Sequence, residues 1–480
     1  MGARLSESSV RAALLERARS TTIIARFTFA LALVVPAALM GQRPATAPPA
    51  DTASPCVGCP SSTHPARALS SAIVFELIPY GYNRWIDHTD WSKNLRDGWG
   101  WDDDHFAVNQ FAHPYSGNLF YNSARTNGYG FRGAAPYAFA GSVLWEYFGE
   151  TTRPSINDLI NTTLGGITLG ETTYRLSSMI LDARTTGMTR VVREVSAALV
   201  DPPRAFGRLM DGDVWRIGSN PRDRIPSSVI SEVQVGYQRL THGRARSPLR
   251  GLDQPFASYS LAYGDPMGRD TSEQFSSFRL DGALGGAASG ALSELRATGF
   301  LAVRELRGDS TTHHRVALTM NYHYYNNAAF VSGGQGFSGI FLSRFPLGAL
   351  NTMRTELWAT GMALGAVRSD YSASPAAIAN ETARDYDYGP GVSARGQARF
   401  EHAGRTTVAG SYEATWLRVV SGTARHQDYQ TFSLRAETGV TRHLSLGASE
   451  QLFNRTGFYA AHPTVRARDA QTRAYLAFRI

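Results

Sequence analysis

The stretch RVALTMNYHYY, residues 315–325, carries the pattern that decides the fold. Apolar or aromatic side chains occupy every second position: Val316, Leu318, Met320, Tyr322 and Tyr324. The positions between them are mostly polar or small: Arg315, Ala317, Thr319, Asn321 and His323. Because successive side chains of a β-strand point to opposite faces, this alternation predicts a strand with one apolar and one polar face.

The same alternation recurs from Ile225 to the C-terminus. About twelve segments show it, which predicts an antiparallel transmembrane β-barrel, because in lipid every backbone group must be paired inside a closed sheet. The segments are 227–240, 254–264, 275–286, 290–307, 311–325, 335–345, 351–366, 390–403, 405–421, 427–441, 443–454 and 466–480. Charged residues on the polar faces are expected either to pair across strands in a filled lumen or to line an aqueous pore.

The connections and the last strand support this interpretation. The links at 403–404 and 441–442 are very short, whereas 367–389 and 455–465 are long, as expected for periplasmic turns and outer loops. The terminal AYLAFRI resembles the C-terminal β-signal of outer-membrane barrels. We therefore expect outer-membrane lipid and the barrel-assembly machinery as partners.

Composition agrees with a barrel. The chain has 480 residues, 18% charged and 11% aromatic, and its mean hydropathy of −0.24 is too polar for a bundle of transmembrane helices. The formal net charge of +8 lies partly in the N-terminal leader and is otherwise spread along the chain. This distribution does not indicate a nucleic-acid partner.

The N-terminus indicates export to the bacterial outer membrane. Residues 1–41 combine arginines with an apolar run at 27–40, the pattern of a signal peptide. Residues 42–68, rich in Pro, Ala, Ser and Thr, predict a disordered linker. Within it, Cys56 and Cys59 indicate either a local disulfide or free thiols. A helical domain is predicted over 69–225 and the barrel over 226–480, an α+β architecture.

The helical domain contains segments of helical periodicity. They are expected near 104–112, 116–127, 136–148, 155–181 and 189–210, separated by Pro, Gly and Asn. We expect this domain either in the periplasm or as a plug in the barrel lumen.

The central stretch resembles an uncharacterised family of bacterial exported proteins known as a domain of unknown function. The likeness covers roughly residues 75–215 and implies no activity. The residues that carry it are Trp101-Asp102-Asp103, Asn109-Gln110-Phe111, His113-Pro114-Tyr115, Asn122, Arg125-Thr126-Asn127-Gly128-Tyr129, Trp145-Glu146-Tyr147, Pro154-Ser155-Ile156-Asn157-Asp158 and Asn161. A fainter pattern is similar to VanZ-like membrane proteins: Glu146, Ser155, Asp158, Asn161, Gly165 and Gly166.

The polar residues of this stretch favour a hydrogen-bond network that holds a helical plug to the barrel, because buried polar groups need partners. The network residues are Asp102, Asn109, Asn122, Arg125, Asn161, Glu171 and Arg175. His105, Asn109 and His113 recur at intervals of four, which would place them on one face of a continuous helix.

Two alternatives remain open for the same stretch. A lipid-modifying enzyme of hydrolase or acyltransferase type would use His105, His113, Glu146 and Asp158 for acid/base catalysis. A metal site would combine His113 with Asp102, Asp104 or Glu146, but the spacing matches no familiar zinc motif. The sequence therefore predicts no metal, no cofactor and no particular ligand, and the expected function is an envelope structural or transport role.

Overall fold

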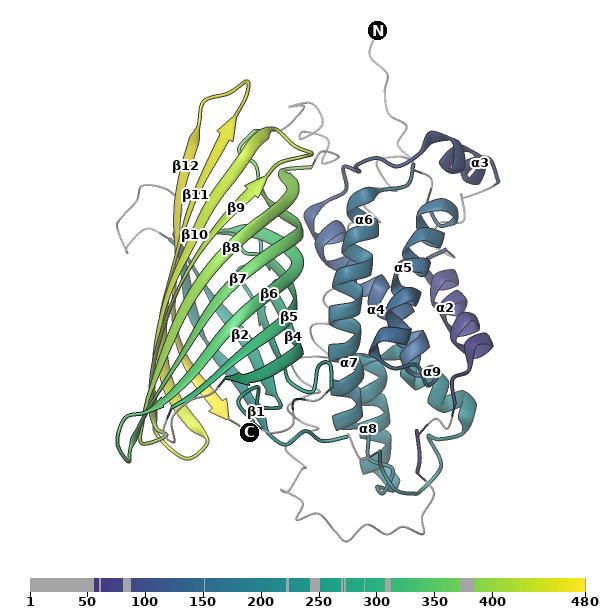
Figure 1. The fold of residues 1–480 in the computed structure, drawn as a ribbon, viewed down its shortest axis with the longest axis horizontal. Helices are drawn as coiled ribbons and strands as arrows, with labels where there is room; N and C mark the ends of the chain where they lie inside the picture. Colours follow the sequence, from purple (N-terminus) through teal and green to yellow (C-terminus); the bar gives the residue numbers. More distant parts are fainter. Residues whose placement is uncertain are drawn as a thin grey trace.

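In the computed structural model, a group of helices lies beside a β-barrel (Figure 1). The structure describes residues 56–59, 62–80, 88–150, 152–221, 224–241, 251–268, 271, 273–288, 290–306, 312–371 and 384–479. The predicted signal peptide and most of the predicted linker lie outside these residues. Helix α2 begins at Pro65, so the end of the predicted linker is helical.

The C-terminal region is a closed antiparallel barrel of twelve strands in which β1 pairs with β12. The strands are β1 (Val229–Thr241), β2 (Leu252–Tyr263), β3 (Phe278–Leu284), β4 (Leu292–Leu306), β5 (His313–Asn326), β6 (Val331–Pro346), β7 (Asn351–Arg368), β8 (Tyr386–His402), β9 (Thr406–Arg418), β10 (Ala424–Gly439), β11 (Leu444–Tyr459) and β12 (Val465–Arg479). Each predicted segment overlaps one of these strands. The prediction of a helical region followed by a twelve-stranded barrel is confirmed.

The connection between β2 and β3, residues 264–277, departs from the predicted alternation of loop lengths. It is long, yet it lies at the same end of the barrel as the short β8–β9 and β10–β11 turns. Its Phe275 is fully buried and covers Gly299 of β4, where an added Cβ would come within 2.0 Å of the Phe275 ring. The extra residues of the β2–β3 connection therefore place the Phe275 side chain on the outer wall of the barrel.

The outer face of β5 has two environments. Val316 and Leu318 are exposed, whereas Met320, Tyr322 and Tyr324 on the same face are buried in a cluster shared with the helices. Since side chains on one face of a strand share one side of the barrel wall, the helices cover the outside of the barrel. The predicted helical plug is wrong: the helices lie against the wall and not in the lumen (Figure 1).

The lumen is filled by paired charges and by an apolar cluster. Arg279 donates to Glu356 over 2.8 and 2.5 Å. Arg479 contacts Glu232 at 3.0 Å and Glu437 at 2.7 Å, so these lumen charges pair across strands, whereas Arg296 and Arg395 line a cavity. The apolar cluster comprises Leu240, Tyr325, Ala329, Phe330, Met362, Val367, Leu417, Tyr429 and Phe453. A cavity of about 100 Å³ remains beside them.

The helical region contains two helices that sequence periodicity missed, and its other elements follow the predicted order. The elements are α2 (Pro65–Tyr80), α3 (His88–Asp97), η1 (Val108–Ala112), α4 (His113–Arg125), α5 (Phe131–Phe148), α6 (Ile156–Ile160), η2 (Asn161–Gly165), α7 (Gly166–Ile180), α8 (Gly187–Val200) and α9 (Pro202–Asp211). The missed helices are α2 and α3. None of the helices among the described residues is long and apolar enough to cross a membrane.

Two boundaries differ from expectation for identifiable reasons. The helix predicted over 189–210 is broken at Asp201, whose side chain accepts from the Arg204 backbone N–H at 3.1 Å, and Pro202 begins the next helix. The segments predicted at 104–112 and 116–127 are one continuous helix, because η1, a π-helical stretch, runs directly into α4.

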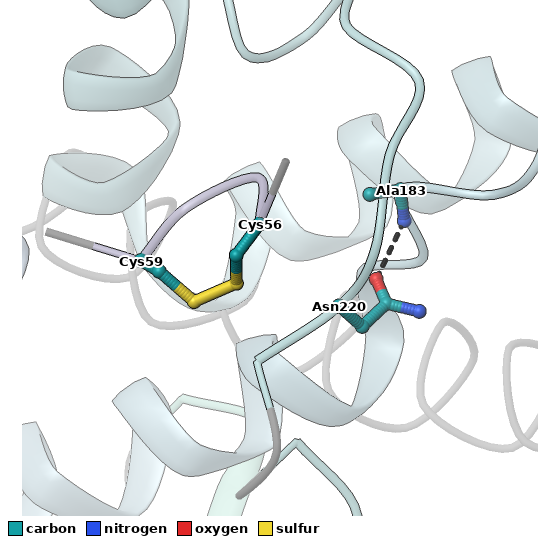
Figure 2. The surroundings of a disulfide bond; sticks show 4 residues. All are labelled: Cys56, Cys59, Ala183 and Asn220. Atoms are coloured by element: carbon teal, nitrogen blue, oxygen red, sulfur yellow. Dashed lines mark hydrogen bonds between the residues drawn. A yellow bond between two sulfur atoms is a disulfide. The ribbon is translucent and has the colours of Figure 1, made fainter. Parts of the chain in front are cut away.

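Cys56 and Cys59 form a disulfide (Figure 2). The small loop that it closes lies against the end of the helical region, where the Val57 backbone N–H donates to the Ser219 carbonyl at 3.0 Å. Beside it, Asn220 accepts from the Ala183 backbone N–H at 2.7 Å. The sequence had left a disulfide and free thiols open, and the structure has the disulfide.

Candidate functional site

The helices meet the barrel wall through polar groups as well as apolar ones. The Tyr322 hydroxyl donates to the Gln110 carbonyl at 2.6 Å, and the Tyr386 hydroxyl donates to the Asp104 carbonyl at 2.7 Å. Asn109 donates to the Tyr386 hydroxyl at 2.9 Å. Gln335 of β6 also donates to the side chain of Asn161. Tyrosine and glutamine on the outer wall thus match the polar residues of the central stretch, and this fixes the helices on the barrel.

Glycines set how closely the helices approach one another. A Cβ added at Gly117 of α4 would lie 1.8 Å from the Thr162 carbonyl oxygen, and one at Gly166 would lie 2.5 Å from the Gly117 Cα. Only glycine permits this backbone contact. The contact brings the start of α4, with His113, against the α6–η2 segment that carries Asp158.

His113 and Asp158 belong to a buried acidic cluster that we define as Asp102, His113, Glu146, Glu150 and Asp158. The His113 Nε2 lies 3.5 Å from the Asp158 Oδ1. Asn157 donates to the side chains of both Asp102, at 2.8 Å, and Asp158, at 2.9 Å. One atom of each of His113, Glu146 and Glu150 that could bind a metal ion lies within 4.8 Å of the other two. The cluster therefore gathers three carboxyl groups near one imidazole, and Asn157 links the fourth, Asp102, to Asp158.

The carboxyl groups of the acidic cluster have no arginine or lysine in a salt bridge within the described part of the chain. Burial, together with the neighbouring charge of Glu150, raises the pKa of Glu146 to about 10. Burial also raises the pKa of Glu150, and burial with the charge of Asp102 raises that of Asp158. One oxygen of Glu146 and one of Asp158 are buried without a hydrogen-bond partner. Without a bound cation, these groups favour the protonated form.

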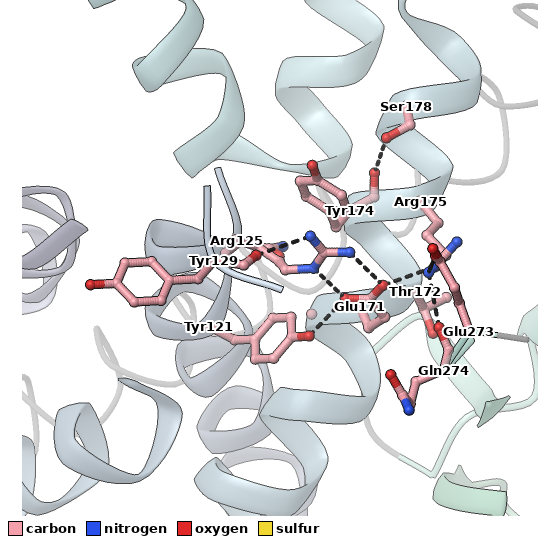
Figure 3. A network of polar contacts seen from close by, with 12 residues as sticks. Tyr121, Arg125, Tyr129, Glu171, Thr172, Tyr174, Arg175, Ser178, Glu273 and Gln274 are labelled. Carbon is pink, nitrogen blue, oxygen red and sulfur yellow. Dashed lines mark hydrogen bonds and ion pairs between the residues drawn. The ribbon is translucent and has the colours of Figure 1, made fainter. Parts of the chain in front are cut away.

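A second buried carboxylate, Glu171 of α7, has the opposite environment (Figure 3). Arg125 donates to it at 2.8 and 3.0 Å, Arg175 at 2.8 Å and the Tyr121 hydroxyl at 2.7 Å. Burial alone would raise the pKa of Glu171, but Arg125 and Arg175 together hold it below its usual value. We define the Glu171 centre as Glu171, Arg125, Arg175 and Tyr121.

The predicted catalytic residues are brought together only in part. His113, Glu146 and Asp158 lie in the acidic cluster, and all three are buried. His105 is exposed and lies outside it. The prediction that His105, Asn109 and His113 share a helix face fails for His105, which precedes the first helical residue, Phe106; Asn109 and His113 are both buried.

The predicted structural network is divided between the two centres. Asn109 donates to Asp102 at 2.7 Å, and Asn161 donates to the Asn109 carbonyl at 2.7 Å, so these residues border the acidic cluster. Asn122 donates to Thr173 at 3.0 Å and links α4 to α7. Arg125, Glu171 and Arg175 form the Glu171 centre.

Sequence reasoning missed several residues of the site. Glu150 lies just beyond the end of α5, where no helical periodicity marks it as a neighbour of Glu146. Asn157 lies inside the PSIND motif but was given no role of its own. Tyr386 and Tyr388 were not predicted, because nothing local marks an outer-face tyrosine that meets a helix instead of lipid.

Comparison with solved structures finds similar barrels at low identity. NanC porin in a rhombohedral crystal form has 9% sequence identity and a TM-score of 0.29, over 52% of this chain and 100% of that chain. KdgM porin has 7% sequence identity and a TM-score of 0.24, over 51% of this chain and 98% of that chain. OmpT, an outer membrane protein of Vibrio cholerae, has 6% sequence identity and a TM-score of 0.22, over 53% of this chain and 97% of that chain.

No curated protein matches the chain. The family model for a domain of unknown function, DUF3943, matches residues 98–203, a range that includes both buried centres. The likeness of the central stretch to an uncharacterised family is therefore confirmed: residues 98–203 are a DUF3943 match.

Proposed function

We propose that the protein is a bacterial outer-membrane barrel that holds its helical region against the outer barrel wall, in an envelope structural role. The observation that carries this proposal is the division of the outer wall into an exposed apolar part and a part covered by helices. The export signal expected over residues 1–41 supports the compartment.

The uncovered wall has the surface that lipid requires. Large apolar side chains point outward from β5 and from β7 to β11, and about half of the surface of each is exposed: Leu318, Leu357, Val392, Trp416, Leu434 and Leu446. In a soluble protein such a continuous apolar surface would promote aggregation. In a bilayer it replaces lipid–lipid contacts, and the closed sheet leaves no backbone edge unpaired.

The helical region also presents apolar side chains outward. On α8, Met188, Val191 and Val195 are more than half exposed, whereas Arg190 and Arg193 of the same helix are buried. This reverses the usual orientation of a surface helix in water. Trp215, just beyond α9, is 76% exposed, and tryptophan favours the headgroup boundary of a membrane. These features support contact of the helical region with the bilayer.

The filled lumen favours a structural role over an open pore. The apolar cluster around Phe330 and Phe453 occupies one part of the lumen. Ion pairs such as Arg279–Glu356 occupy another. The cavity of about 100 Å³ beside Phe330 and Phe453 has room for roughly seven to ten water molecules.

The test is fractionation of cells that express the full chain, followed by gel electrophoresis with and without heating. We expect the protein in the outer-membrane fraction and a faster-migrating folded form in unheated samples. Leu357→Arg, on the exposed wall, should destabilise the folded barrel in the membrane by roughly 2–4 kcal/mol if the site lies near the bilayer midplane. Leu357→Met is the matched control. A soluble periplasmic protein without heat-modifiable mobility would contradict the proposal.

The alternative of a lipid-modifying enzyme has no observation in its favour. Two of its four predicted residues, Glu146 and Asp158, are completely buried, and a third, His105, lies apart from them. We therefore propose no reaction.

A further inference from the structure

We infer that His113, Glu146 and Glu150 bind a divalent transition-metal ion, with Asp158 beside them at 3.5 Å from the His113 Nε2. The site lies where the start of α4 meets the end of α5 and Glu150, two residues beyond that helix. This inference concerns the helical region alone and does not depend on the membrane role proposed above.

The geometry is close to that of a coordination shell. One donor atom from each of His113, Glu146 and Glu150 lies within 4.8 Å of the other two. Four ligands about 2.1 Å from a tetrahedral ion are separated by roughly 3.4 Å. Side-chain adjustments of about 1 Å would therefore close the shell. Glu146 lies in the last turn of α5 and Glu150 follows the Gly149 cap, so the end of this helix brings both carboxylates to His113.

The hydrogen bonds leave one oxygen of Glu146 and one of Asp158 available to an ion. The Ser155 backbone N–H donates to one oxygen of Glu146 at 2.7 Å, and the other oxygen is buried without a partner. Asn157 donates to one oxygen of Asp158, and the other is likewise buried without a partner. Both side chains are completely buried. Buried unpaired carboxylate oxygens cost free energy, and a cation would remove this cost.

The surroundings of the other ligands resemble the outer shell of a metal site. Thr162 lies 3.4 Å from the His113 Nδ1, which leaves Nε2, the atom near Asp158, to face the cluster. The Trp145 indole N–H donates to Glu150 at 2.8 Å, and the Thr152 hydroxyl donates to its second oxygen at 3.1 Å. Such contacts orient metal ligands and still leave lone pairs on each carboxylate oxygen.

The charge balance points the same way. The acidic cluster contains four carboxyl groups and one imidazole, with no arginine or lysine salt bridge in the described residues. Imidazole nitrogen with carboxylate oxygens, and no thiolate, suits Zn²⁺, Mn²⁺ or Fe²⁺ better than Mg²⁺, which prefers oxygen ligands and retains water.

The test uses the full chain, folded in detergent and stripped with EDTA. Titration with Zn²⁺ and with Mn²⁺, followed by dialysis and elemental analysis, should yield about one metal ion per chain for at least one of them. Glu150→Gln and Glu146→Gln should weaken binding by roughly 100-fold or more, since loss of an outer-shell contact alone costs about 10- to 100-fold. Glu194→Gln is the matched control, because this partly buried glutamate pairs with Arg190 and Arg208 outside the acidic cluster.

A second measurement keeps the test independent of variant folding. Co²⁺ added to the wild-type chain should give a visible absorption spectrum of nitrogen and oxygen ligation that Zn²⁺ abolishes. Sub-stoichiometric binding of all three ions by the folded wild-type chain would overturn the inference. Unchanged affinity in both glutamine variants would also overturn it. Heat-modifiable mobility, measured on the same samples, reports the barrel separately.

Discussion

The acidic cluster and the Glu171 centre lie in the same helical region, and both contain completely buried carboxyl groups: Glu146 and Asp158 in the first, Glu171 in the second. They differ in what balances the charge. Glu171 receives two arginines from its own chain, Arg125 and Arg175. The acidic cluster receives none, and two of its oxygens have no partner at all. The difference shows that a buried carboxylate is supplied with a permanent cation from the chain or must take up a proton or a metal ion.

The largest expected effect comes from removing the charge of the Glu171 centre. Glu171→Gln leaves Arg125 and Arg175 buried beside a neutral group, and the loss of one partner of a buried ion pair costs about 3–5 kcal/mol. Urea unfolding of the helical region in detergent, followed by tryptophan fluorescence, measures the loss. Glu273→Gln, at an exposed glutamate near Arg175, is the control. A loss below about 1 kcal/mol would remove the distinction between the two centres.

The next effect tests the contact that assembles the acidic cluster. Gly117→Ala places a Cβ 1.8 Å from the Thr162 carbonyl oxygen, and overpacking of this kind costs about 1–3 kcal/mol. Because His113 begins the same helix, metal binding should weaken together with stability. Gly339→Ala, where nothing lies within 4 Å of the added Cβ, is the control. Unchanged stability and unchanged metal binding would show that the close approach does not position the cluster.

A smaller effect separates charge from geometry in the Glu171 centre. Arg125→Lys retains the positive charge but loses the paired N–H donors that contact both oxygens of Glu171. We expect a loss of about 1 kcal/mol, well below that of Glu171→Gln. Equal losses in the two variants would mean that hydrogen-bond geometry, and not charge, stabilises the centre. The same unfolding measurement decides between them.

The smallest effect is expected in the acidic cluster at low pH. In metal-free protein below pH 4.5, Glu146→Gln should change the free energy of unfolding by no more than about 1 kcal/mol, because the wild-type carboxyl is then protonated in both the folded and the unfolded state. The pKa of Glu146 rises from its usual 4.5 to about 10 in the folded state, so its contribution to stability is complete below pH 4.5. That contribution falls as pH rises from 4.5 to 10.

The pH dependence should distinguish the two centres in chelated protein. Glu171 has a lowered pKa, so its contribution is present above the pKa of the unfolded state and is lost as pH falls through the folded value. Unfolding curves between pH 4 and 10 should show that Glu146→Gln removes part of the alkaline loss, whereas Glu171→Gln does not. A wild-type alkaline slope that Glu146→Gln leaves intact would contradict the assignment of Glu146.

The strands were predictable because their signal is local. The alternation of Val316, Leu318 and Met320 with smaller or polar neighbours follows from the pleat of a single strand and needs no knowledge of its partners. The helices were less predictable. The π-helical stretch η1 alters the register between Asn109 and His113, and the capping of α9 by Asp201 breaks a segment whose periodicity continues across it.

The candidate site was predictable in its residue types but not in its grouping. The sequence predicts His113, Glu146 and Asp158 as parts of one site. It also predicts Arg125 and Glu171 in one network with Asp102 and Asn109, although Arg125 and Glu171 form a separate centre. Which acid faces an arginine depends on how α4, α5 and α7 cross. These crossings are set by the backbone contact of Gly117 with Thr162 and Gly166, which joins residues distant in the sequence.

The sequence by itself determined the number and order of the strands, the existence of a helical region and the residues from which a site is built. Only the tertiary structure decided that the helices cover the outer wall instead of filling the lumen. The physical reason is that Val316, exposed on the wall, and Tyr322, buried under a helix, lie on the same face of one strand. An apolar outer face is the same signal whether lipid or a helix covers it.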